Sequence, residues 1–316
     1  MRHQRGRAAL PDAAAAPAGA AGVRRRLLGP ARFSASPATL PLALGLPVLL
    51  WQLVFFAAPL AFLVVVTFWQ VRSFRLEPAF VWDNWSRILG STTFHRALLH
   101  TLSVTSLATA LALLLALPAA YTIAFRLRPR WRELAVAALV VPVFASYVVR
   151  IYAWQVVLSP EGIANSLLQL IGLGPWPLLG GAFSLQVGLL TLTLPIAVLI
   201  LVFAFSGIDG TLIEAAENLG GPRRRVVLHV LLPAARPALA LAATTSFLLA
   251  FGDFVSPMFM TGSKPPTLAI LIVDTVKSGS QWPRASVIGV AMLAVLVIVA
   301  GIGRALAAPR TARGAG

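Results

Sequence analysis

The sequence predicts an all-α membrane protein with six transmembrane helices and both termini in the cytoplasm. Hydrophobic residues make up 58% of the 316 residues and charged residues only 11%, with a mean hydropathy of +0.84. A soluble domain carries about 25% charged residues, so this chain has too few charges to cover a water-facing surface. Two further observations support lipid as the main solvent. They are the long apolar stretches and the uneven distribution of basic residues.

The apolar stretches define the predicted spans. A helix needs about 20 apolar residues to cross a bilayer. Six stretches are long enough, and together they form a six-span domain over residues 40–308. They are residues 40–69, 97–125, 134–158, 183–205, 237–260 and 285–308.

The basic residues predict the orientation. With the N-terminus inside, 18 of the 26 Lys and Arg residues fall in cytoplasmic segments, seven fall in outside segments, and Arg150 lies within a span. Basic residues accumulate on the cytoplasmic side of membrane proteins. This asymmetry accounts for the net charge of +16 without a nucleic-acid partner.

The two ends of the chain are predicted to be cytoplasmic tails. Residues 1–39 are rich in Ala, Pro and Arg and show no apolar periodicity, which predicts a disordered basic tail. Residues 309–316 form a second, short tail. The chain contains no cysteine, so disulfides and thiol chemistry are excluded.

The loop at 207–236, between the fourth and fifth predicted spans, predicts a short amphipathic helix. Thr211 and Glu214 have the spacing of a capping box. The helix should end at Gly220-Gly221-Pro222, because Gly adopts the left-handed C-cap and Pro cannot continue a helix. Its apolar stripe consists of Leu212, Ala215, Ala216 and Leu219. By local pattern alone, such a helix could equally be an ordinary loop helix that covers the end of the bundle.

This loop resembles the EAA motif of the permease subunits of binding-protein-dependent, type I ABC importers. The motif is Glu-Ala-Ala, three residues, Gly, nine residues, an aliphatic residue, one residue and Leu-Pro. The chain has Glu214-Ala215-Ala216, Gly220, Val230 and Leu232-Pro233 at these positions, with Val in place of the usual Ile. Other segments resemble the first permease of spermidine/putrescine-type systems. They include Asp83-Asn84-Trp85, Arg150-Ile151-Tyr152 and Gly252-Asp253-Phe254-Val255.

The resemblance implies the fold and the partners of a type I ABC importer permease. Such a chain lies in the bacterial inner membrane and pairs with a second homologous permease. Two ATPase subunits and a periplasmic substrate-binding protein complete the importer. The chain would not be an enzyme and would bind no cofactor, since ATP and Mg²⁺ belong to the ATPase. The solute is expected to be small and polar, with a polyamine as the first candidate. The residues implied in coupling to the ATPase are Glu214, Ala215, Ala216, Leu219, Gly220 and Pro233.

Two ionisable residues lie well inside predicted spans, Arg150 and Asp253. A charge in mid-bilayer costs at least ~2.5 kcal/mol, so such residues usually face a protein interior. Each lies sixteen residues beyond the inner end of its span, which predicts equal depth, and we predict that the two charges interact. Their role could be to line the translocation path or only to lock helices together. The other candidates for the path are the neighbouring aromatic residues Tyr147, Trp154 and Phe254.

Other kinds of chemistry find little support in the sequence. No Gly-x-x-x-x-Gly-Lys-Ser/Thr loop occurs, so the chain cannot bind ATP in the P-loop manner. The four histidines have no metal-site spacing. The alternative function is an ion-coupled secondary transporter, which predicts inverted repeats and a relay of buried acids. The spans contain one buried acid and no clear repeat.

Overall fold

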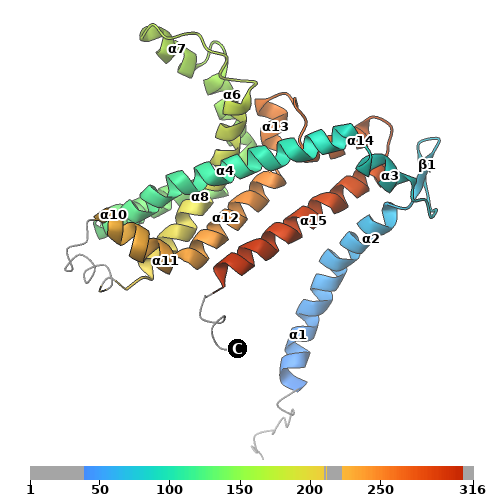
Figure 1. Ribbon diagram of the computed structural model, residues 1–316, viewed down its shortest axis with the longest axis horizontal. Coiled ribbons are helices and arrows are strands. Elements are labelled where there is room, and N and C mark those ends of the chain that lie inside the picture. The colour runs from blue at the N-terminus through green and yellow to red at the C-terminus, as the bar shows by residue number, and fades with distance from the viewer. Residues whose placement is uncertain (1–38, 210, 212–222, 309–316) are drawn as a thin grey trace, which may run out of the picture. The chain divides into compact units, whose positions relative to one another are not determined.

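The computed structural model describes residues 39–209, 211 and 223–308 (Figure 1). The chain divides into two units, residues 1–57 and 58–316. In the first unit, α1 (Thr39–Gln52) leads into a π-helical turn, η1 (Leu53–Ala57). The large apolar side chains from Leu46 to Phe56 are exposed, which suits a helix surrounded by lipid.

In the second unit, the described residues form further helices and one β-hairpin. Its elements, in chain order, are α2 (Ala58–Val66), β1 (Gln70–Arg72), β2 (Arg75–Glu77), α3 (Asp83–Leu89), α4 (Thr92–Phe125), α5 (Pro129–Phe144), α6 (Tyr147–Leu158), α7 (Ile163–Leu170), α8 (Ala182–Ser206), α10 (Arg223–Val226), η2 (Val227–Leu231), α11 (Leu232–Ala234), α12 (Arg236–Phe251), α13 (Val255–Met260), α14 (Leu268–Lys277) and α15 (Trp282–Ala307).

The core of this unit lies where α4 packs against α8 and α12 (Figure 1). One face of α4 repeats alanine at every fourth residue. These alanines, Ala108, Ala112, Ala116 and Ala120, are fully buried. A small side chain lets two helix backbones approach closely, which is a common way to pack helices in lipid. The opposing face of α8 supplies the bulk that fills the core, through Leu189, Leu201 and Phe205.

Among the residues that the structure describes, four helical segments are long and apolar enough to cross a membrane. They are Gly45–Val66, Thr92–Phe125, Ala182–Ser206 and Trp282–Ala307. The number rises to six if two bent helix pairs each count as one span. The structure therefore confirms a helical, multi-span membrane protein.

The third predicted span, 134–158, is not one continuous helix, although its two helices can together count as one bent span. Helix α5 ends at Phe144, and α6 starts at Tyr147 after a bend of 98°. Ala145 is extended, with a ψ of 149°, which interrupts the helical hydrogen bonds. The calculation of depth from a constant helical rise therefore fails at this bend.

The fifth predicted span, 237–260, is also interrupted. Helix α12 ends at Phe251, and α13 begins at Val255, so Asp253 lies in the break rather than in a helix. A second bend of 69° separates the segment Val227–Ala234 from α12. Pro233 and Pro237 flank this bend, and neither can donate a backbone hydrogen bond to the preceding turn.

The loops after α2 and α13 contain structure that the sequence analysis missed. Strands β1 and β2 form an antiparallel hairpin in which Gln70 pairs with Glu77, and α14 precedes the last long helix. The hairpin is a small addition to the predicted all-α fold. The amide of Asn84 fixes the chain beside it, donating to the carbonyls of Thr67 and Trp69 at 2.9 and 2.8 Å.

Candidate functional site

A polar cluster surrounds Asp253 in the break between α12 and α13. The side chain is 8% exposed. Its carboxylate accepts hydrogen bonds from the amides of Val255 and Ser256, at 2.9 Å and 3.3–3.4 Å, and from the hydroxyl of Tyr147 at 2.7 Å. The two amides belong to the first turn of α13, where the backbone favours a negative charge. The acid is thus satisfied by its own chain.

Tyr147 connects three parts of the bundle. It starts α6, and its hydroxyl lies 2.5 Å from the hydroxyl of Ser256 and 3.5 Å from the carbonyl of Gly188 in α8. Because the single tyrosine proton goes to Asp253, the Ser256 hydroxyl donates to the Tyr147 oxygen. A Cβ atom at Gly188 would lie 2.7 Å from Oγ of Ser256, so the glycine allows α8 and α13 to come this close.

Arg150 lies one turn after Tyr147 on α6. Its Nη1 donates to the carbonyl of Thr191 in α8 at 3.0 Å, and its guanidinium carbon lies 5.6 Å from the centre of the Tyr147 ring. Its Nε is buried and has no hydrogen-bond partner among the described residues.

The direct ion pair between Arg150 and Asp253 is not formed. In the part of the chain that the structure describes, the ion pairs are Arg72–Glu77 and Arg87–Asp83. The phenol of Tyr147 lies between the two charges, with its ring facing Arg150 and its hydroxyl bonded to Asp253. The prediction of pairing was wrong because it rested on equal depth in two straight helices, and both helices are broken.

The remaining aromatic candidates, Trp154 and Phe254, take no part in the hydrogen bonds around Asp253. Trp154 and Arg150 line a groove of about 370 Å³ formed with α8. Phe254 stands beside Asp253 in the break and is half exposed. The sequence analysis missed Ser256, although its position three residues after Asp253 has cap spacing. It also missed Thr191, which acts through its backbone carbonyl, and Gly188, which acts through its carbonyl and by having no Cβ, so neither leaves a side-chain signal.

The predicted coupling segment is described only at its edges. Glu214, Ala215, Ala216, Leu219 and Gly220 lie outside the described residues. At the near edge, the amide of Thr211 donates to the carboxylate of Asp209 at 3.0 Å and holds the pKa of that acid below its usual range. At the far edge, Pro233 lies in the short helix α11, next to the 69° bend.

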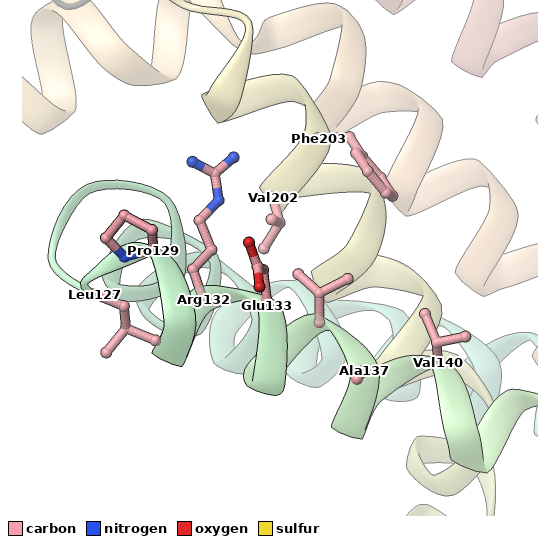
Figure 2. A pocket seen from close by; sticks show the side chains of 9 residues that line it. Leu127, Pro129, Arg132, Glu133, Ala137, Val140, Val202 and Phe203 are labelled. Atoms are coloured by element: carbon pink, nitrogen blue, oxygen red, sulfur yellow. The ribbon is translucent and has the colours of Figure 1, made fainter.

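A second groove separates α5 from α8 (Figure 2). It has a volume of about 560 Å³ and is mostly apolar. Figure 2 shows Arg132 and Glu133 near one end and Ala137 and Val140 further along. Arg132 donates a hydrogen bond to the hydroxyl of Ser206, which ties α5 to the end of α8. No group of three or more His, Asp or Glu side chains among the described residues is arranged to hold a metal ion.

The bundle, with its broken helices, has the fold of an ABC importer permease. Two solved structures of a bacterial alginate ABC importer resemble it, with TM-scores of 0.70 and 0.67. They cover 85% and 88% of this chain and 96% of each matched chain, at 20% and 18% sequence identity. The second of them is a complex with an alginate pentasaccharide-bound periplasmic protein. No protein-family model matches the chain.

Within this class, the chain resembles the spermidine/putrescine transport system permease protein PotB. It is 28% identical to PotB of Escherichia coli over 229 residues, which is 72% of this chain and 81% of that protein. It is 27% identical to PotB of Haemophilus influenzae over 206 residues, which is 63% of this chain and 70% of that protein. These similarities, together with the apolar helices, identify a multi-pass inner-membrane protein.

Proposed function

We propose that this chain is a permease subunit of an ATP-driven importer. With a second, homologous permease it forms the path for a small polar solute that a periplasmic binding protein delivers. The observation that carries the proposal is the fold, which matches an ABC importer permease over 85% of the chain. The spacing of the EAA motif adds independent support, since fold similarity alone says little about function.

The proposed topology has six spans with both termini in the cytoplasm. It counts each of the two bent pairs as one span and follows the distribution of basic residues. In this orientation the loop at 207–236 faces the cytoplasm. Its motif residues, Glu214 to Gly220, dock on one of two ATPase subunits, which bind ATP and Mg²⁺ and carry out the hydrolysis.

A polyamine is the proposed solute, because PotB is named for spermidine and putrescine. The residues proposed for the path are Arg150, Asp253, Tyr147, Trp154 and Phe254. Asp253 is already satisfied by Tyr147 and two backbone amides, so its first role is to fix the break between α12 and α13. Release of Tyr147 would free a carboxylate oxygen for a cationic solute as the path opens.

The test is Gly220→Val in the complete importer, reconstituted with both permeases, the ATPase and the binding protein. Substrate-stimulated ATP hydrolysis and uptake should be lost while membrane insertion is retained, because a branched residue disfavours a left-handed turn. Gly301→Val is the control, since a Cβ at Gly301 meets nothing within 4 Å. Normal coupled uptake by the Gly220→Val importer would refute the coupling role. Uptake by this chain without ATPase, and abolished by an uncoupler, would instead support a secondary transporter.

A further inference from the structure

The start of α5 concentrates positive charge, on the cytoplasmic side of the membrane in the proposed topology. Arg126, Arg128, Arg130 and Arg132 fall within seven residues, and one acid, Glu133, directly follows them. In the described part of the chain, none of these arginines forms an ion pair with a carboxylate. The first amides of α5 have no side-chain cap, which adds partial positive charge at the same place. This end of the helix therefore attracts anions.

An apolar groove begins beside these arginines. It runs between α5 and α8 and has a volume of about 560 Å³. Arg132 lines one end of it, and Figure 2 shows Ala137 and Val140 further along α5. From residue 132 to residue 140 an α-helix rises about 12 Å, which is close to the ~15 Å thickness of the hydrocarbon in one leaflet. The groove thus leads from a basic surface toward the middle of the bilayer.

Helix α5 is poorly covered by the rest of the chain. In the described structure none of its residues is buried, and Trp131, Leu134 and Val141 are between 52% and 67% exposed. So much apolar surface is unfavourable in water but suits contact with acyl chains. The guanidinium carbon of Arg130 lies 5.7 Å from the centre of the Trp131 ring. Basic and aromatic side chains both collect at the headgroup level, so this pair fits the membrane interface.

The α5–α8 groove is a different surface from the groove beside Arg150. Val140 lines the first groove, and Pro142 lines the second. Two residues of separation turn an α-helix by about 200°, so these side chains face nearly opposite sides of α5. Ala135 and Leu139 pack against the core between the two sides. What covers the face of α6 therefore does not determine what occupies the α5–α8 groove.

The occupant has to match both the charge and the apolar walls. The proposed solute, a polyamine, is a cation and is repelled by the arginines. An acidic protein surface would match the arginines but not the apolar length of the groove. An anionic phospholipid matches both, because its phosphate accepts hydrogen bonds from guanidinium groups and its acyl chain fills an apolar groove.

We infer that the α5–α8 groove binds an anionic phospholipid of the cytoplasmic leaflet, phosphatidylglycerol, with its phosphate at Arg132 and one acyl chain along Val136, Ala137 and Val140. Arg132 donates one hydrogen bond to the hydroxyl of Ser206, which holds the guanidinium at the mouth of the groove. A guanidinium has five N–H donors, so others remain for the phosphate. The inference goes beyond the proposed function, because this lipid is bound and not transported. It requires only the membrane location and the proposed orientation.

Because Ser206 is the last residue of α8, the lipid would lie beside the start of the loop at 207–236. The Glu133 carboxylate lies at the same end of the groove and opposes an anion. Four arginines outweigh this single acid, so the balance at the mouth still favours a negative headgroup.

The first experiment compares two lipids on the native chain, purified with its partners and placed in nanodiscs. A small amount of phosphatidylglycerol or of phosphatidylcholine, each with the same photoreactive acyl chain, is added, and the labelled residues are mapped by mass spectrometry. We expect phosphatidylglycerol to label residues 132–140 and 202–203 more strongly than phosphatidylcholine does. Leu114, an exposed residue of α4, should be labelled equally by both. Equal labelling of the groove by the two lipids, or a groove covered by protein and labelled by neither, would overturn the inference.

The second experiment tests the charge. Arg132→Gln should lower the labelling by phosphatidylglycerol about fivefold, because one basic residue near an anionic headgroup is worth about that factor. Arg132→Lys keeps the charge and should retain most of the labelling. The control is Arg304→Gln, which removes an exposed arginine of α15 that does not line the groove. An equal loss in Arg304→Gln would show that the lipid responds to the overall charge and not to a site at Arg132.

The third experiment tests the acyl chain without changing any charge. Ala137→Trp should fill the groove and lower the labelling by phosphatidylglycerol, whereas Ala138→Trp should not, because Ala138 is exposed but does not line the groove. Elution of both variants with their partners from a gel-filtration column checks that each still folds and assembles. Native labelling of Ala137→Trp at residues 132–140 would mean that no acyl chain lies in the groove, and the inference would be wrong.

Discussion

The hydroxyl of Tyr147 lies 2.7 Å from Oδ2 of Asp253, and this bond connects the start of α6 to the break between α12 and α13. The start of α6 follows the interruption of the third predicted span, and Asp253 lies in the interruption of the fifth. A hydrogen bond to a carboxylate is stronger than a neutral one, and in a site that excludes water it also fixes geometry. The contact therefore holds two irregular segments in register with each other.

Removing this bond should destabilise the bundle. Tyr147→Phe and Asp253→Asn should each lower stability, and the double variant should lose less than the sum of the two. A coupling of about 1–3 kcal/mol is expected for a hydrogen bond to a charged group. The measurement is a double-mutant cycle on the unfolding of the purified protein in detergent. Tyr152→Phe is the control, because Tyr152 is half exposed on the same helix. Strictly additive losses would mean that the two groups act independently.

Gly188 should not tolerate a side chain. In Gly188→Ala, the new Cβ would lie 2.7 Å from Oγ and 2.9 Å from Cβ of Ser256, so α8 and α13 must separate. We expect a loss of about 1–3 kcal/mol, the usual cost of overpacking, with reduced uptake because the Tyr147 cluster shifts. Gly207→Ala, at the end of the same helix, is the control because its Cβ would make only ordinary contacts. Equal stability of the two variants would contradict the close approach of α8 and α13.

A similar comparison tests the packing of α12 against α15. A Cβ at Gly303 would lie 2.0 Å from Oγ1 of Thr244, whereas a Cβ at Gly301 meets nothing within 4 Å. Gly303→Ala should therefore lower the melting temperature, and Gly301→Ala should leave it unchanged or raise it, since Ala favours a helix over Gly by about 1 kcal/mol. Thr244→Ala should partly rescue Gly303→Ala by removing Oγ1. If Thr244→Ala raised the melting temperature of Gly301→Ala by the same amount, the effect of Thr244→Ala would not be local to Gly303.

The topology is testable because the chain contains no cysteine. Single cysteines at Thr211, Ser263 and Ala312 should respond differently to a thiol reagent that does not cross the membrane. In intact cells, position 263 should be labelled and positions 211 and 312 protected. All three should react once the membrane is permeabilised. Labelling of 211 or 312 in intact cells would exclude the proposed orientation.

The long apolar helices could be predicted from the sequence because hydropathy depends only on composition. Helices α4, α8 and α15 lie where the second, fourth and sixth apolar stretches are. The breaks could not be found in this way. Ala145 and Ser146 have no strong signal against helix, and the bend there accompanies tertiary bonds such as that between Tyr147 and Asp253. A signal was available at the other break, since Gly252-Asp253 followed by Ser256 resembles a helix stop and a new cap.

The residues of the site could be predicted more easily than their contacts. Arg150, Tyr147 and Asp253 stand out because charged and polar groups are rare in spans, and the structure brings them together. Which of these side chains contact one another depends on the helix breaks, because a break changes both the depth of a residue along the bundle and the direction of its helix. Thr191 contributes through its main-chain oxygen, which any residue possesses, and Gly188 contributes through its main-chain oxygen and through the absence of a Cβ, so side-chain chemistry could not reveal either contribution.

The alanine stripe on α4 limits how this protein can vary over evolutionary time. At Ala108, Ala112, Ala116 and Ala120 the side chain is fully enclosed between neighbouring helices. Replacement by Gly or Ser keeps the helices together, whereas each larger residue forces them apart. These positions should therefore accept only side chains of equal or smaller volume. A homologue with a larger residue in the stripe is expected to have lost the same volume from the facing surface of α8, and such paired exchanges would trace the contact between the two helices without a structure.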